Sequence, residues 1–396
     1  MTPPPVPGGN PGTYEERLAQ WFLEHTFFLD FVYRNQRGKG GKGELADAVV
    51  LHDDIVLMAQ IKAQSSARPA HQWAQGAIDE ALRQLQYTNR MLFGGVVRDL
   101  TSATLGTIRF DPSLHMRRYG LILVAQDAVT YDPGSLVPAL SGLPFPVHVL
   151  SLADFAMLTE RFDTAADFVT YLDFRRDLFD VVHLPVHGET AVLREIAAQA
   201  GDVLRRWRPD ISGELLARSV AAFRRKASGE VSRSPEWRYS LAIDDIIARL
   251  HQRDPALPWN KDTDAYAVMR VAAELSWLTR DRRMRMGERL LSMCADANDG
   301  NAHDFAHYLR ASRIAFHFVA TNAPREERVR YLGALTLITQ ARFNAAKVVG
   351  VATEPIGGGR SYDVLLRIGE LDEAARELIL KTNPLGSQDR DKGPTA

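Results

Sequence analysis

Two apolar segments separated by a short polar turn constrain the fold of this chain most strongly. ELADAVVL (44–51) and IVLMAQIKA (55–63) are apolar at successive positions, not only at every second one. Strands of this kind are covered on both faces, as in a sheet flanked by helices. The pair therefore predicts a buried hairpin inside an α/β fold, with Asp53 and Asp54 as its two turn residues.

The two-residue turn defines which side chains of the hairpin share a face. With this turn, His52 faces Ile55, and counting back along both arms places Asp47 opposite Gln60. Directly opposed residues have Cβ atoms about 5 Å apart. The period of two along a strand adds Lys62 to the same face. A bulge or a longer loop would change this pairing.

The three polar groups suit the hydrolysis of a phosphodiester bond. The carboxylate of Asp47 and the amide oxygen of Gln60 are hard ligands of the type that Mg²⁺ takes. Such an ion polarises a phosphoryl group and activates a water molecule, while Lys62 would orient that water or stabilise developing negative charge. In an ordinary buried hairpin, by contrast, Asp47 would cap a strand and Lys62 would be a solvated end charge. Burying polar groups without partners is costly, which favours the site.

The segments around the hairpin alternate between helix and strand. Apolar spacing predicts a helix from about Thr13, and the aromatic and β-branched run FFLDFVYRN (27–35) predicts a strand. A helix is expected over 72–91, and further strands over 119–126 and from Pro146, the last one running into a helix. The order helix, strand, strand, strand, helix, strand is typical of an α/β domain with a mixed sheet.

The chain of 396 residues is long enough for two or three domains. We place the α/β domain at 13–180 and a second, mainly α-helical domain of unknown role at 188–386, with a small β element between 345 and 369. The Pro- and Gly-rich start (1–12) and the polar tail (387–396) are expected to be disordered.

The first domain resembles the PD-(D/E)XK nuclease superfamily over residues 13–180. The match consists of an acidic helix, Asp47, and Gln60-Ile61-Lys62, which is similar to the QxK form of Mrr-type restriction endonucleases. The sequence GluGluArgLeu at 15–18 resembles the start of archaeal Holliday-junction resolvases, and GlyGluLeuAlaAsp at 43–47 resembles predicted prokaryotic nucleases. The chain departs from the commonest pattern because no Pro precedes Asp47 and because Gln60 replaces an acidic residue.

The resemblance implies a restriction-endonuclease-like αβββαβ core and a catalytic site formed by Asp47, Gln60, Lys62 and a helix carboxylate, Glu16. Asp47, Gln60 and Glu16 would bind Mg²⁺ or Mn²⁺, and the partner would be nucleic acid, with DNA favoured. Glu15 and Glu24 lie on the same helix as Glu16 and are its rivals. Glu44 is second choice with Glu24, because regular pairing puts it on the opposite strand face from Asp47.

Three further residues are candidates for substrate contacts. Lys39 and Lys42 lie in a Gly-rich basic loop next to the proposed site, and Gln84 lies on the helix after the hairpin. A flexible connector and a plain amphipathic helix are the alternative interpretations. His303 and His307 have an i, i+4 spacing that can bind zinc on a helix, but we expect packed or surface histidines.

Composition excludes several classes of protein. The net charge of −1 argues against coating nucleic acid by bulk electrostatics, although a local basic groove remains compatible. The one cysteine, Cys294, excludes an internal disulfide framework and is expected to be a small core residue. No apolar run is long enough to cross a bilayer and no signal pattern starts the chain, so we expect a cytoplasmic protein with no membrane partner.

Basic residues cluster at Arg205–Arg208, Arg224–Lys226 and Arg280–Arg285, where they could follow a phosphate backbone or belong to a charge-balanced helical surface. Three functions follow in order of preference. The first is a metal-dependent endonuclease in restriction, phage defence or DNA repair. The second is a nuclease-like protein that binds nucleic acid or a partner without cutting. The third is a separate activity in the second domain; a homo-oligomer is compatible with each.

Overall fold

The computed structural model describes the chain in segments. These are residues 11–28, 31–37, 44–63, 70–97, 99–102, 106–125, 143–179, 188–251, 264–297, 301–355 and 361–382. The chain divides into two compact units, unit 1 (Met1–Ser234) and unit 2 (Pro235–Ala396). The helices over 189–233, which sequence analysis assigned to the second domain, fall in unit 1.

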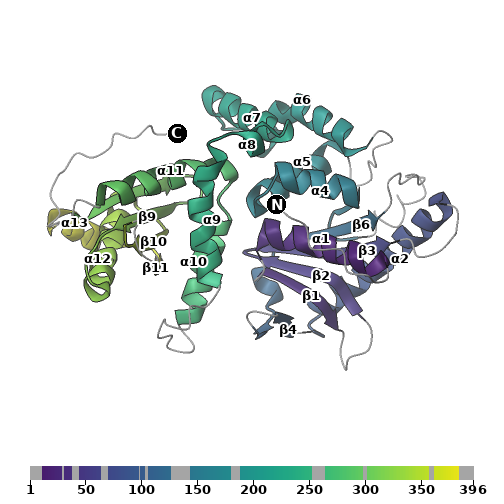
Figure 1. Ribbon diagram of the computed structural model, residues 1–396, viewed down its shortest axis with the longest axis horizontal. Coiled ribbons are helices and arrows are strands. Elements are labelled where there is room, and N and C mark those ends of the chain that lie inside the picture. The colour runs from purple at the N-terminus through teal and green to yellow at the C-terminus, as the bar shows by residue number, and fades with distance from the viewer. Residues whose placement is uncertain are drawn as a thin grey trace. The chain divides into compact units, whose positions relative to one another are not determined.

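Unit 1 is an α/β unit with a mixed five-stranded sheet, as predicted (Figure 1). Its strands follow the order β1-β2-β3-β6-β7; β1, β2 and β3 are antiparallel, and β3, β6 and β7 are parallel. The elements are α1 (Pro11–Phe27), β1 (Val32–Arg37), β2 (Glu44–His52), β3 (Ile55–Ala63), α2 (Ala70–Phe93), β4 (Asp99–Ser102), β5 (Gly106–Arg109), the 3-10 turn η3 (Pro112–Leu114), β6 (Arg117–Ala125), β7 (Val147–Ser151), α4 (Leu152–Arg161), α5 (Ala165–Phe179), α6 (Glu189–Trp207), α7 (Gly213–Ala227) and α8 (Glu230–Arg233).

The first helix differs from the prediction at both ends. It begins at Pro11, within the stretch expected to be disordered, and proline is well suited to a first helical position. It also continues to Phe27, so the strand predicted over 27–35 begins only at Val32. The ring of Phe27 packs edge-on against Phe168 of α5, which explains why it belongs to the helix. Residues 1–10 and 387–396 lie outside the described residues.

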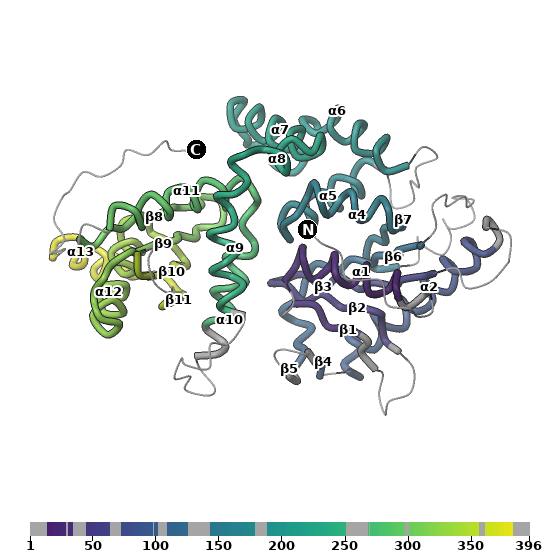
Figure 2. Tube along the Cα trace, viewed as in Figure 1, coloured from purple at the N-terminus to yellow at the C-terminus, as the bar shows by residue number. Residues whose placement is uncertain are grey.

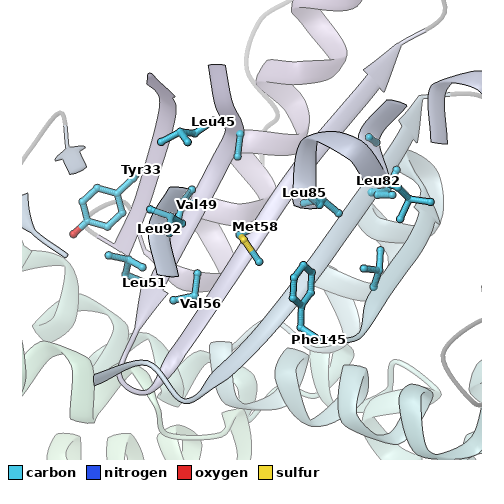
Figure 3. Packing of buried hydrophobic residues seen from close by; sticks show 14 of the residues in the cluster. Tyr33, Leu45, Val49, Leu51, Val56, Met58, Leu82, Leu85, Leu92 and Phe145 are labelled. Atoms are coloured by element: carbon cyan, nitrogen blue, oxygen red, sulfur yellow. The ribbon is translucent and has the colours of Figure 1, made fainter. Parts of the chain in front are cut away.

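Helices cover both faces of the sheet, as the continuous apolar runs of β2 and β3 require. On one face, Ile78, Leu82 and Leu85 of α2 share a buried cluster with Val56 and Met58 of β3 (Figure 3). On the other face, α1, α4 and α5 form a layer whose rings contact one another. Because alternate side chains of a strand point to opposite faces, residues of β3 that share the parity of Met58 face α2.

Unit 2 contains more β structure than predicted. Its four-stranded sheet has the order β11-β10-β9-β8, in which β9 and β10 are parallel (Figure 2). The elements are α9 (Trp237–His251), α10 (Asp264–Ser276), α11 (Arg280–Asp296), β8 (His303–Leu309), β9 (Ile314–Ala320), α12 (Arg325–Phe343), β10 (Lys347–Thr353), β11 (Tyr362–Ile368) and α13 (Glu373–Thr382). The expected strands β10 and β11 are present, whereas β8 and β9 were not anticipated.

Membrane insertion finds no support in the helices: within the described segments, none has the length and apolar character needed to span a bilayer.

The position of α2 depends on a close approach at Gly120 of β6. A Cβ atom on Gly120 would lie 2.9 Å from Val147 Cγ2, 3.0 Å from Leu85 Cδ1 and 3.1 Å from Phe145 Cε2. We expect Gly120→Ala to lower the free energy of unfolding by about 1–3 kcal/mol, because a packed core resists an added methyl group. Urea denaturation measures the change.

Gly76 of α2 provides the matched control for Gly120. A Cβ atom there meets nothing within 4 Å. Gly76→Ala should therefore raise the free energy of unfolding by about 0.5–1 kcal/mol, since it removes only the entropy cost of a helical glycine. Equal stability of Gly120→Ala and the wild type would contradict the close packing of α2.

Candidate active site

The hairpin of β2 and β3 has the predicted turn and register. His52 pairs with Ile55, and the ladder continues to Ala48 and Ala59. Asp53 has a positive φ of 52°, as the first position of a two-residue hairpin turn requires. The pairing ends at Ala48–Ala59, one step before Asp47 and Gln60.

Beyond this point β2 follows β1 and separates from β3. The β1–β2 ladder extends to the pair Arg37–Glu44, with a shift of register between Gln36 and Arg37. Such a shift marks an extra residue in one strand, which interrupts the regular main-chain bonding. The regular alternation that placed Glu44 opposite in facing to Asp47 therefore does not extend to Glu44, whose side chain lies outside the described part of the structure.

Asp47 fills the gap that this separation leaves on β3. The main-chain N–H of Ile61 donates to Oδ2 of Asp47 over 2.5 Å. A main-chain donor in a nearly buried position needs an acceptor, and the aspartate supplies one where the strand ladder has stopped. One carboxylate oxygen thus has a structural task, as in the capping alternative considered from sequence.

Gln60 is buried, with 3% of its surface exposed. Its Nε2 donates to the main-chain oxygen of Leu45 over 3.3 Å, and the hydroxyl of Thr88 of α2 donates to the same oxygen. Leu45 lies within the shifted part of β2, so its carbonyl takes side-chain partners. This contact gives a physical reason for glutamine where a carboxylate is more common, because a carboxylate would face a carbonyl oxygen.

Lys62 lies on the face of β3 that is turned toward α2. Its Nζ donates to Oε1 of Gln84 over 2.7 Å and lies 3.2 Å from Oε1 of Glu80. Nε2 of Gln84 also donates to Glu80 over 3.3 Å. The lysine side chain is 16% exposed and the glutamate side chain 55%, so the pair is open to solvent on the glutamate side.

One stripe of α2 thus supplies the partners of the hairpin residues. Glu80, Gln84 and Thr88 follow one another at intervals of four, which places them on one side of the helix. Gln84 was expected to contact substrate; in this structure it contacts Lys62. Sequence reasoning missed Glu80, although its position four residues before Gln84 was a usable signal.

Glu16 is linked to the hairpin through Gln20 of α1. Nε2 of Gln20 lies 3.3 Å from Oε1 of Glu16 and 3.3 Å from the main-chain oxygen of Asp47. The link reaches the backbone of Asp47, and α1 belongs to the layer opposite α2. Within the described segments, no group of three or more histidine, cysteine or acidic side chains could hold a metal ion, so a three-carboxylate cluster is not formed.

The rival carboxylates of α1 have different surroundings. Glu24 forms an ion pair with Arg34 of β1. Oε2 of Glu15 is buried and has no hydrogen-bond partner among the residues that the structure describes. Lys39 and Lys42 lie outside the described residues.

The proposed zinc spacing in unit 2 is excluded by the fold. His303 and His307 lie on strand β8, not on a helix. Four residues of a strand span about 13 Å, which is too far for two ligands of one zinc ion. Cys294 is buried in α11, as expected for a small core residue.

Comparisons of the chain with profiles of known protein families, with curated protein sequences and with solved structures found no match.

The structural task of Asp47 separates two substitutions at this position. Asp47→Ala leaves the N–H of Ile61 without its acceptor and should lower the free energy of unfolding by about 1–3 kcal/mol. Asp47→Asn keeps an oxygen acceptor and should lose less than half as much. Equal losses for both variants in urea denaturation would contradict this role of Asp47.

The contact of Gln60 with Leu45 predicts the result of restoring an acidic residue. Gln60→Glu loses the Nε2 donor and places a carboxylate against a carbonyl oxygen, so we expect a loss of about 1–3 kcal/mol at neutral pH. This environment favours the protonated carboxyl group, which can donate to Leu45. The deficit relative to wild type should therefore shrink as the pH falls, which denaturation at a series of pH values tests. Wild-type stability of the variant at neutral pH would count against the contact.

Proposed function

We propose that the protein is a metal-dependent endonuclease that hydrolyses phosphodiester bonds of nucleic acid, with DNA as the favoured substrate. The observation that carries this proposal is the convergence of polar groups at one end of a buried hairpin. Lys62 is held by α2, Asp47 caps the opening strand pair, and Gln60 lies between them.

The arrangement of unit 1 agrees with a restriction-endonuclease-like core, which we propose as its fold. The helix–strand–strand–strand–helix–strand order is formed by α1, β1, β2, β3, α2 and β6, with the small β4–β5 hairpin inserted before β6. Fold analogy is a weak warrant for function, so the proposal rests on the side chains of the site.

The donor atoms suit a hard divalent cation. Asp47 would hold Mg²⁺ or Mn²⁺ together with the amide oxygen of Gln60, since the amide nitrogen is committed to Leu45. Glu16 is the proposed third ligand from α1. When bound, such an ion polarises the phosphoryl group and helps to activate water.

Lys62 would contribute an N–H donor to the phosphate. An ammonium group has three N–H donors, and Gln84 and Glu80 accept from two directions. The remaining donor is available to a phosphate oxygen or to the attacking water. Because two side chains of α2 fix the ammonium, it would be positioned before substrate arrives, which is the condition for strong electrostatic stabilisation.

Cleavage assays test the proposal. Plasmid, linear, branched and single-stranded DNA, with RNA for comparison, would be incubated with Mg²⁺ or Mn²⁺. We expect Lys62→Met and Asp47→Asn each to lower the rate about 100-fold or more, the scale seen when one preorganised electrostatic interaction is removed. Chelation of the metal should abolish cleavage.

Lys381 supplies the control for Lys62. It is exposed and paired with Glu377 within α13, so Lys381→Met removes one lysine with its helical ion pair and should leave the rate unchanged. Full wild-type cleavage by both Asp47→Asn and Lys62→Met would show that the proposed site is wrong.

One observation favours a second function, binding without cleavage. Asp47, Gln60 and Lys62 each have a partner within the protein that accounts for the side chain without any chemistry. Calorimetry distinguishes the two functions. The absence of Mg²⁺ and Mn²⁺ binding, together with salt-sensitive binding of DNA, would support this alternative. A role in restriction, phage defence or DNA repair belongs to the nuclease proposal.

A further inference from the structure

The arginines of α11 in unit 2 divide into two groups with different surroundings. Arg280 and Arg283 are buried, and both donate to the carboxylate of Asp244 of α9. They join two helices and are not available to a ligand. The basic cluster anticipated from sequence is therefore partly a structural feature of the core.

The other group forms what we call the basic stripe, Arg282, Arg285 and Arg289. At about 100° per residue these positions fall within an arc of about 60° on the helix. Arg285 and Arg289 are exposed, and Arg282 is half-buried. Seven residues of helix at about 1.5 Å each give the stripe a length of about 10 Å.

The basic stripe lies beside β8, which is an edge strand of its sheet. The guanidinium of Arg289 is 4.8 Å from the ring centroid of Phe305. His307 is two residues further along, on the same face of the strand. Burial, and then the charges of Arg282, Arg285 and Arg289, lower the pKa of His307 to about 4. Three cations thus act on one point of β8.

The nearby carboxylates lie to the side of the basic stripe or beyond it. Asp304 is on the opposite face of β8, where it contacts His317 of β9 with 3.2 Å between Oδ2 and Nε2. Asp281 and Glu288 lie about a quarter of a turn around α11 from the stripe. Asp296 shares its direction but lies about 10 Å beyond Arg289.

From this geometry we infer that the basic stripe binds the phosphate backbone of a nucleic acid. Its length corresponds to about three steps of one DNA strand at about 3.4 Å each. Guanidinium groups bind phosphate through two parallel N–H donors, and such interactions position a protein without reading sequence. The inference goes beyond the proposed function, because it concerns unit 2 and holds whether or not the hairpin of unit 1 cuts.

The test measures binding of the full chain to labelled duplex and single-stranded oligonucleotides by fluorescence anisotropy. EDTA is present throughout, so a failure of cleavage cannot alter the readout. Removing one arginine–phosphate interaction should reduce the slope of log K against log salt by about 0.9 for duplex DNA. For the variant Arg282→Gln, Arg285→Gln, Arg289→Gln, the loss of affinity between 50 and 200 mM salt should be about 40-fold smaller than for wild type.

Two further variants keep the test decisive. Arg285→Gln alone replaces an exposed side chain and should lower the slope by about one while leaving the melting temperature unchanged. The control variant Arg205→Gln, Arg218→Gln, Arg225→Gln removes three exposed arginines of unit 1, each paired with an acidic neighbour, and should change the slope little.

Three results would overturn the inference. The first is an unchanged slope in both stripe variants at wild-type melting temperature. The second is an equal effect of the control variant. The third is an equal loss of binding to polyglutamate, which would identify an acidic polypeptide as the partner of the basic stripe.

Discussion

The end of the β2–β3 ladder at Ala48 and Ala59 is the constraint around which the candidate site is built. Where two strands separate inside a covered sheet, main-chain groups lose their partners and must find others. In this protein the side chain of Asp47 serves the N–H of Ile61, and the side chains of Gln60 and Thr88 serve the carbonyl of Leu45. Polar side chains are therefore required at the place where the proposed chemistry needs them.

This double requirement connects the structural and the chemical interpretations of the site. A carboxylate has two oxygens and an amide has a donor and an acceptor end, so one end can stabilise the fold while the other faces a ligand. Lys62 is placed in the same way, since its contacts with Glu80 and Gln84 hold α2 to the hairpin and also fix the ammonium. Substitutions that remove a whole side chain mix the two effects, whereas substitutions such as aspartate to asparagine separate them.

The hairpin could be predicted from sequence because a two-residue turn and a period of two determine its register without reference to other elements. The shift opposite Gln36 could not, because it depends on how β2 meets β1. The strand Ile314–Ala320 was missed since a short apolar run does not distinguish a strand from a buried helix. Arg280 and Arg283 could not be separated from their neighbours in α11 without knowing that Asp244 of α9 faces them.

The bond between Ile61 and Asp47 has a consequence for observing the site in solution. The amide proton of Ile61 exchanges with solvent only when its acceptor lets go, so its exchange rate reports how often the carboxylate leaves the backbone. A ligand that drew the carboxylate away would speed exchange at this one amide while the neighbouring amides of β3, bonded within the sheet, kept their protection. Ile61 is thus a natural sensor of site occupancy that needs no label and no substrate turnover.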